Sequence, residues 1–316
     1  MNTHQHITPE VLISEVGPRD GLQSVKATMA TPDKLRWIDA LVASGLREIE
    51  VCSFVPARLL PQMADAAEVV RHAVRHAVRH PGVTVMALVP NVQGARAALA
   101  AGAHKLTIPV SASAAHSLAN VRKTREDMLQ EVRAIAQLRA DTAPGVRVEA
   151  AISTAFGCTL QGAVPEDEVI WLAQACIEAG VDEVGLSDTT GMANPAQVRR
   201  LFLQLRAAVG AQAGAAHLHN TRGLGLANCL AAYEAGVRTF DASLAGLGGC
   251  PYAPGASGNV VTEDLVFMFE AMGVRTGVNL ERLLAARAPL RAGLPGELLY
   301  GMTAEAGLPK GWTQPA

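Results

Sequence analysis

A short junction recurs four times along the chain, and it constrains the fold more than any other feature. At each copy an alanine-rich stretch ends at a glycine, and a short apolar stretch follows within a few residues; the glycines are Gly45, Gly102, Gly180 and Gly236. Glycine suits this position because the residue after a helix often takes a left-handed backbone conformation that other residues resist. The glycines stand 57, 78 and 56 residues apart. Each interval therefore has room for two units of one strand and one helix.

The intervals contain the elements that such units need. Further short apolar strands are expected at Val11 to Val16, Val83 to Val89, Val146 to Ile152 and Ala215 to His219. Helices are expected at Pro32 to Ala43, Pro61 to Val78, Gln93 to Ala101, Arg125 to Arg139, Pro165 to Ala179, Pro195 to Val209, Leu224 to Ala235 and Thr262 to Met272. Eight strands that alternate with helices over about 270 residues predict a parallel sheet closed into a (β/α)8 TIM barrel. An open doubly wound sheet is the alternative.

We expect a single catalytic domain over residues 1–316. The barrel should occupy about residues 7–275. Residues 279–316 resemble an extra C-terminal helix followed by a Gly- and Pro-rich end. This C-terminal helical extension is not expected to form a second domain.

The composition excludes several classes of protein. The 316 residues are 49% apolar and 18% charged, which excludes an intrinsically disordered chain. With 27 Lys and Arg against 29 Asp and Glu, and with few aromatic residues, the chain does not resemble a nucleic-acid binder. No apolar run reaches the roughly 18 residues that cross a bilayer, so no membrane partner is expected. Five cysteines without a C-x-x-C pair indicate reduced thiols, and the predicted location is the cytoplasm.

Residues 71–80 repeat Arg-His every four residues, in the sequence R-H-A-V-R-H-A-V-R-H. On a helix, residues four apart lie on one face, so the Arg and His side chains should form adjacent stripes. We interpret the repeat as a short duplication on a solvated helix end. A face that binds cations or anions is the alternative.

Polar side chains follow several predicted strands, in the places where the active sites of such barrels lie. The first strand runs into Arg19 and Asp20, and the second and sixth strands end near Glu50 and Asp188. Taken singly, each of these residues could be a structural charge at a strand end. Together they indicate a polar mouth.

His217 and His219 stand two residues apart at the end of the seventh predicted strand. Residues at this spacing on a strand point to the same side, so both imidazoles should face the barrel mouth. A single buried histidine is usually a hydrogen-bonded core residue. A pair at this spacing and place predicts metal ligands.

The stretch from Gly246 to Asn259 has five glycines in fourteen residues. Such a segment adapts easily and suits a loop that closes over a ligand. It could also be a plain surface connection, but Cys250 would then be an exposed thiol open to oxidation.

Four motifs occur in an order and spacing that resembles the 3-hydroxy-3-methylglutaryl-CoA lyase family, within the Asp-Arg-Glu metallolyase barrels. They are G-P-R-D-G-L-Q, S-D-T-T-G, H-L-H-N-T and G-L-G-G-C-P-Y-A-P-G-A-S-G-N. The resemblance covers roughly residues 7–290, and the glycine-rich loop is its most specific part. Because this family consists of TIM barrels, the resemblance supports the fold predicted from the junctions.

The resemblance also implies roles for individual residues. It implies that a divalent cation, Mg2+ or Mn2+, is held by Asp20, His217, His219 and Asn259. Two imidazoles also permit Zn2+ or Co2+. It implies catalytic roles for Arg19 at the thioester oxygen, for Cys250 in proton transfer, and for Glu50 and Asp188 around the reacting centre. The general base could be Asp188, His217 or Glu50.

Three residues are expected to contact the substrate: Arg19, Gln23 and Arg222. Arg222 belongs to a departure from the family pattern, because Asn220, Thr221 and Arg222 follow the second histidine where the family has Asp first. Arg222 makes the mouth more cationic and could bind a substrate carboxylate or a CoA phosphate as a fork. A second departure lies after the fifth strand, where Thr159 follows Cys158 in place of the family's proline.

The expected reaction is the cleavage of 3-hydroxy-3-methylglutaryl-CoA to acetyl-CoA and acetoacetate, as in leucine breakdown. A longer 3-hydroxy-3-alkylglutaryl-CoA is an alternative substrate. Alternative functions are a Claisen-type synthase, although such enzymes carry long C-terminal regions, and a metal-dependent hydrolase, although these tend to place the histidine pair on the first strand. A non-catalytic binding protein is disfavoured because all four metal positions are filled. The resemblance also implies a homodimer.

Overall fold

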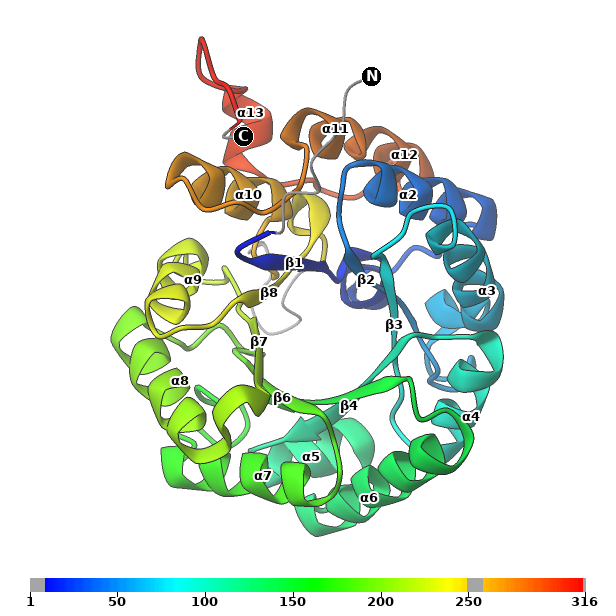
Figure 1. Ribbon diagram of the computed structural model, residues 1–316, viewed down its shortest axis with the longest axis vertical. Helices are drawn as coiled ribbons and strands as arrows, with labels where there is room; N and C mark the ends of the chain where they lie inside the picture. Colours follow the sequence, from blue (N-terminus) through cyan, green and yellow to red (C-terminus); the bar gives the residue numbers. More distant parts are fainter. Residues whose placement is uncertain (1–8, 249–257, 315–316) are drawn as a thin grey trace.

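A closed barrel of eight parallel strands forms the centre of the structure (Figure 1). The structure is a computed structural model and describes residues 9–248 and 258–314. Each strand pairs with the next, and β8 returns to β1. The strands are β1 Leu12–Glu15, β2 Glu48–Ser53, β3 Thr84–Leu88, β4 Lys105–Ser111, β5 Arg147–Ser153, β6 Glu183–Ser187, β7 Ala213–His217 and β8 Thr239–Ala242. The predicted TIM barrel is confirmed, and the open sheet is wrong.

Helices on the outside of the ring connect successive strands (Figure 1). The main ones are α2 Thr31–Ala43, α3 Ala66–Ala77, α4 Val92–Ala101, α6 Arg125–Thr142, α7 Glu166–Glu178, α8 Pro195–Val209 and α9 Gly225–Glu234, and α10 Thr262–Ala271 follows β8. The four junction glycines have φ of 98°, 95°, 102° and 94° in chain order. This is the left-handed conformation that the junction pattern predicted. At Gly45 a side chain is also excluded by space, because a Cβ would lie 2.6 Å from the carbonyl oxygen of Gly277.

The structure differs from the sequence-based expectation in several connections. The helix expected from Pro61 to Val78 is divided into a short 3-10 turn, η2 Pro61–Met63, and α3. An unpredicted helix, α5 Ala114–Val121, follows β4 and is capped by the side chain of Ser113. It is only eight residues long, so it offers too few positions for a helical period to stand out. Two further 3-10 turns are η3 Gly210–Gln212 and η4 Leu244–Gly246.

The expected C-terminal helix is divided into three short helices: α11 Leu280–Ala285, α12 Arg287–Gly293 and α13 Met302–Ala306. Figure 1 shows α11 and α12 beside α2, and α13 beside α10. The extension therefore covers the outer ring near the place where the barrel closes. Among the described residues, none of the helices combines the length and the apolar character needed to cross a membrane.

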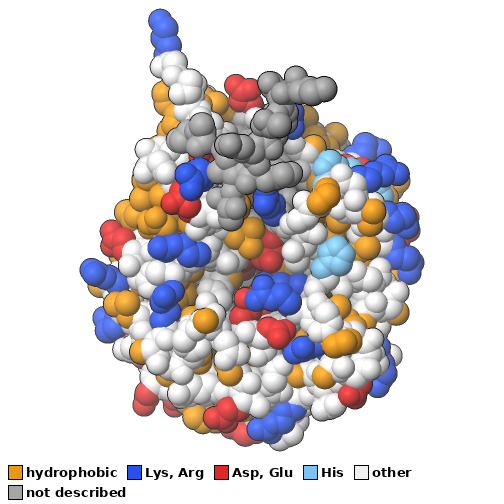
Figure 2. Space-filling model, in the orientation of Figure 1, with side chains coloured by type: hydrophobic (Ala, Val, Ile, Leu, Met, Phe, Trp, Pro, Cys, Tyr) orange, Lys and Arg blue, Asp and Glu red, His pale blue; other side chains and the backbone are white. Residues whose placement is uncertain are grey.

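The end of the barrel where the strands begin contains a buried ion cluster, called here the base cluster. It consists of Lys105, Glu48, Glu149 and Glu183. The Lys105 Nζ atom lies 2.6 Å from Glu183 Oε1, 2.8 Å from Glu149 Oε2 and 3.5 Å from Glu48 Oε2. Figure 2 views the molecule from this end, and side chains of both charges lie near the centre of the face. The opposite end, where the strands finish, carries the candidate site.

Candidate active site and metal centre

The connection after β1 is a single turn of π-helix, η1 Gly17–Gly21, which leads into the short α1 Leu22–Ser24. The backbone N–H of Asp20 donates to the carbonyl oxygen of Val16 at 2.7 Å. Glycine suits position 17 because a Cβ there would lie 2.5 Å from Oε1 of the buried Glu15 and would displace it. This tight turn holds Arg19 and Asp20 next to the carboxyl ends of the strands.

Asp20, His217 and His219 each offer a ligand atom, and the three atoms lie within 4.8 Å of one another. The two Nε2 atoms of His217 and His219 are 3.1 Å apart. Nε2 of His217 is also 3.9 Å from Oδ2 of Asp20. Two ring nitrogens that face each other beside a carboxylate fit a divalent cation, which would sit between them as their common partner.

Asn259 completes the predicted group of metal residues. It is 1% exposed, and its amide Nδ2 donates to Oδ2 of Asp20 at 2.8 Å. Its backbone forms an isolated antiparallel bridge with His219. The seventh strand ends at His217, two residues earlier than expected. The bridge to Asn259 therefore takes over from the strand and positions His219, and the four predicted residues lie together.

The charges and the burial of the cluster shift the pKa values of its members. Burial opposes the charge of Asp20, but Arg19 and the two imidazoles outweigh it and hold the pKa of Asp20 well below its usual range. Burial and the neighbouring His217 lower the pKa of His219 to about 3. An ionised carboxylate and a neutral imidazole are the forms that bind a metal ion.

Asp241 is a site residue that the sequence analysis missed. It lies on β8, and its Oδ2 atom is 3.0 Å from Nδ1 of His217. Although burial alone would lower the pKa of His217, the hydrogen bond and charge of Asp241 raise it. A carboxylate on the far nitrogen fixes the orientation of a ligand imidazole and makes it a better donor. The only signal in the sequence is one acid between Phe240 and Ala242 in an apolar strand.

Arg19 joins the metal residues to Glu50. Its Nε atom donates to Oε2 of Glu50 at 2.5 Å, and its Nη1 atom donates to Oδ1 of Asp20. Arg19 is 8% exposed and Glu50 is 1% exposed. Burial raises the pKa of Glu50, although Arg19 opposes this effect. The guanidinium is therefore held in place by two carboxylates at the edge of the cluster.

Asp188 lies just after β6 and is 1% exposed. Its Oδ1 atom accepts hydrogen bonds from the backbone N–H groups of Met192 at 2.8 Å and Ala193 at 3.1 Å. Its Oδ2 atom is buried and has no hydrogen-bond partner within the described part of the chain. Burial raises the pKa of Asp188 to about 7, against the opposing charges of His217 and Arg222. A carboxyl group with this pKa can take up and release a proton near neutral pH.

The remaining predicted residues lie at the rim or outside the described residues. Arg222 is exposed, and its Nη1 atom donates to the carbonyl oxygens of Thr190 and Gly191 at 3.2 and 2.6 Å. This anchors Arg222 on the loop that follows β6. Gln23 is half-buried on α1. Cys250 lies outside the described residues.

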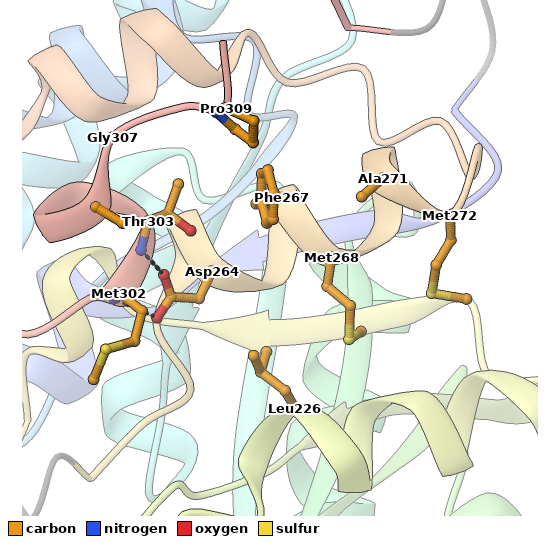
Figure 3. Close-up of a pocket in the computed structure, with 11 residues that line it drawn as sticks. Leu226, Asp264, Phe267, Met268, Ala271, Met272, Met302, Thr303, Gly307 and Pro309 are labelled. Atoms are coloured by element: carbon orange, nitrogen blue, oxygen red, sulfur yellow. Dashed lines mark hydrogen bonds between the residues drawn. The ribbon is translucent and has the colours of Figure 1, made fainter. Parts of the chain in front are cut away.

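An apolar hollow of about 600 Å³ lies between α9, α10 and α13 (Figure 3). Phe267, Met268 and Met302 line it together with Asp264, and it includes no residue of the cluster at the mouth. Oδ1 of Asp264 already accepts a hydrogen bond from the backbone N–H of Thr303 at 2.7 Å. The hollow therefore adds no group for acid–base or metal chemistry, and the cluster at the mouth is the candidate site.

Comparison with known proteins identifies the family of the chain. The HMGL-like family model matches residues 10–289. The hydroxymethylglutaryl-CoA lyase YngG of Bacillus subtilis is 43% identical over 278 residues, which are 88% of this chain and 91% of that protein. The human mitochondrial hydroxymethylglutaryl-CoA lyase is 41% identical over 276 residues, covering 87% of this chain and 83% of that protein.

Solved structures give the same result. The crystal structure of the Bacillus subtilis HMG-CoA lyase superposes with a TM-score of 0.89 at 40% identity, covering 95% of this chain and 98% of that chain. An HMG-CoA lyase of A. baumannii, solved in complex with coenzyme A and 3-methylmalate, gives 0.88 at 39% identity and covers 96% and 97% of the two chains. A family model that spans most of the barrel and these close relatives establish that the chain belongs to the HMGL-like family of hydroxymethylglutaryl-CoA lyases.

Proposed function

We propose that the chain cleaves 3-hydroxy-3-methylglutaryl-CoA to acetyl-CoA and acetoacetate. The observation that carries the proposal is the convergence of Asp20, His217, His219 and Asn259 beside the Arg19–Glu50 pair, at the carboxyl ends of the strands. The relatives named as hydroxymethylglutaryl-CoA lyases support the same reaction.

The four metal residues would hold one divalent cation, Mg2+ or Mn2+. Carboxylate and amide oxygens suit both ions, and Mn2+ accepts imidazole more readily. The cation would lower the pKa of the substrate's C3 hydroxyl and fix its orientation. Asp241 would act through His217, by holding that ring in the orientation that presents Nε2 to the cation.

Asp188 would act as the general base. Its pKa of about 7 supports this role. Glu50 also has a buried oxygen without a hydrogen-bond partner among the described residues, Oε1, but its Oε2 atom accepts from Arg19, whereas Asp188 has no ion pair of this kind. Asp188 takes the proton from the C3 hydroxyl, and the C2–C3 bond then breaks. The hydroxyl carbon becomes the ketone of acetoacetate, and the electron pair of the broken bond passes into the thioester as an enolate.

Arg19 would stabilise the enolate oxygen. Its Nε and Nη1 atoms are held by Glu50 and Asp20, so the guanidinium has a fixed position before the substrate binds. A fixed charge aimed at an oxygen that becomes negative in the transition state is often the largest contribution to catalysis. Cys250 or a water molecule would then return a proton to the enolate carbon, which completes acetyl-CoA.

The coenzyme A part of the substrate would lie at the rim of the barrel mouth. The CoA-bound A. baumannii relative supports an acyl-CoA substrate. We assign Gln23 and Arg222 to substrate binding, with Arg222 at a carboxylate or a phosphate. A cytoplasmic location, a role in leucine breakdown and a homodimer remain predictions. Size-exclusion chromatography with light scattering would test the dimer.

Incubation of the purified protein with 3-hydroxy-3-methylglutaryl-CoA and Mg2+ tests the proposed function. We expect equal amounts of acetyl-CoA and acetoacetate, and no product after the metal is removed with a chelator. A panel of longer 3-hydroxy-3-alkylglutaryl thioesters would show the preferred acyl chain. If none of these thioesters releases acetyl-CoA in the presence of Mg2+ or Mn2+, the proposed reaction is wrong.

A further inference from the structure

A second group of metal-ligand side chains lies on the outer ring of helices. Asp39 comes from α2, and His72 and His76 lie one turn apart on α3. Oδ1 of Asp39 is 2.7 Å from Nε2 of His72 and 3.2 Å from Nδ1 of His76. The ligand atoms of all three residues lie within 4.8 Å of one another. This spacing requires only small side-chain rotations to place a single ion at the roughly 2.0–2.2 Å that Zn2+ takes from imidazole nitrogen and carboxylate oxygen.

The histidines belong to the Arg-His repeat of residues 71–80, which the proposed function does not use. Their rings are aligned along α3: the centroids of His72 and His76 are 6.2 Å apart with 14° between the planes, and those of His76 and His80 are 4.7 Å apart with 20°. In Figure 2, His side chains and a row of Lys and Arg side chains lie at the edge occupied by α2 and α3. The repeat therefore gathers imidazoles on one face, as its period predicts.

The backbone around the three residues is held before any ligand binds. Lys34 and Thr31 of α2 both contact Asp65, which directly precedes α3: Nζ of Lys34 lies 2.7 Å from Oδ1, and the hydroxyl of Thr31 donates to Oδ2 at 2.7 Å. These contacts fix the two helices against each other. A site assembled from fixed elements loses little conformational freedom when an ion binds.

One ring nitrogen of the two histidines has no protein partner. Nε2 of His76 is buried and has no hydrogen-bond partner among residues 9–248 and 258–314. The side chains of His72, His76 and Asp39 are 24%, 20% and 38% exposed, so an ion can reach them.

We propose that Asp39, His72 and His76 form a surface site for a transition-metal cation of the Zn2+ or Co2+ type, separate from the cluster at the barrel mouth. Two imidazoles and one carboxylate are a common ligand set for these ions and leave a fourth position for water. Mg2+ is disfavoured because it prefers oxygen ligands in octahedral geometry.

Titration of the metal-free protein with Co2+, followed by visible absorption and calorimetry, tests the proposal. We expect two Co2+ ions per chain in the native protein and one in the double variant His72→Ala/His76→Ala. The variant His219→Ala should also bind one, since it loses the ion at the mouth and retains the ion on α2 and α3. Asp39→Asn should weaken Co2+ binding at the site on α2 and α3 at least tenfold. Asp33→Asn, a matched change on the same helix, should leave this binding unchanged.

The count of ions separates the two sites whatever the reaction of the enzyme is. Circular dichroism and the melting temperature without metal show that each variant is folded. If the double variant and the native protein bind the same number of ions with the same affinities, the proposed site does not exist. The same conclusion follows if a folded His219→Ala variant binds none.

Discussion

The two ends of the barrel each bury a group of charges, but they balance those charges in different ways. In the base cluster, Lys105 lies within 3.5 Å of all three carboxylates, so the chain itself supplies the central cation. At the mouth, Arg19 pairs with Asp20 and Glu50. The other two members of this cluster, His217 and His219, carry no permanent charge.

The difference shows in the protonation of the central groups. Burial opposes the charge of Lys105, but the three glutamates outweigh it and raise its pKa well above the usual value. His219, which is half-buried, has its pKa lowered to about 3. The base cluster therefore keeps its own cation under all ordinary conditions, whereas the mouth presents the neutral imidazole of His219, which can accept a cation from solution. The base cluster therefore suits a structural role, and the cluster at the mouth suits the reversible binding of a metal ion.

The largest expected effect is at the mouth. In His219→Ala, metal binding at the mouth and catalysis should be lost together, with kcat falling at least about 10³-fold, because the metal supplies several kcal/mol of stabilisation in the transition state. Acetyl-CoA release and isothermal titration with Mn2+ measure the two losses. The melting temperature without metal should stay close to that of the native protein. A variant that kept its activity would remove His219 from the metal site.

The opposite result is expected at the base. Lys105→Met leaves three buried carboxylates without their cation, so the free energy of unfolding should fall by about 3–5 kcal/mol. Urea denaturation measures this loss. Arg147→Met is the matched control: Arg147 is paired with Glu183 at 2.7 Å, but its side chain is 59% exposed, so the loss should be at most about 1 kcal/mol. Equal losses in the two variants would show that the base cluster has no special structural role.

Arg19 should matter for the rate of the reaction. In Arg19→Met, kcat should fall by roughly 10²–10³-fold, the usual cost of removing a charge-stabilising donor from the transition state. KM should change much less. Steady-state kinetics separate the two parameters. An increase in KM alone would place Arg19 in substrate binding and not in enolate stabilisation.

A smaller effect is expected for Asp241. In Asp241→Asn, the affinity for Mn2+ should fall about 10–100-fold, since the carboxylate no longer orients His217. Saturating Mn2+ should restore most of the activity, and this rescue separates a positioning residue from a catalytic one. A loss of activity that high Mn2+ fails to restore would contradict the positioning role.

The last prediction concerns the pH dependence of kcat in the native protein, which changes more gradually and depends on Asp188. A general base has to be ionised, so kcat should fall tenfold per unit as the pH drops below the pKa of Asp188, which burial raises to about 7. A bound divalent cation shifts this limb to lower pH. In Asp188→Asn the residual rate should no longer fall as the pH drops through this range. A limb that persists unchanged in this variant would assign the base to another group.

Much of the fold could be predicted because the junctions carry strong local signals. Gly45 and its three counterparts mark helix ends through a backbone conformation that few other residues adopt. The spacing of His217 and His219 likewise predicted that both rings point to the same side, and their Nε2 atoms lie 3.1 Å apart. These features depend on neighbours in the chain, so they can be read without coordinates.

The features that were missed depend on contacts between distant segments. Asp241 becomes part of the site only because β7 and β8 pair in the register His217↔Asp241. The bridge between His219 and Asn259 joins residues 40 positions apart, and it explains why β7 ends two residues early. A single acid in an apolar strand or a short segment after a strand gives no local indication of its partner.

The proposed reaction depends on one divalent cation shared by Asp20, His217, His219 and Asn259. Pulsed electron paramagnetic resonance of bound Mn2+ tests this sharing, because imidazole nitrogens bonded to the ion modulate the electron spin echo. We expect this modulation in the native protein and in His72→Ala/His76→Ala, and its loss in His217→Ala/His219→Ala. Bound Mn2+ in the native protein without any nitrogen modulation would show that the two histidines do not hold the ion.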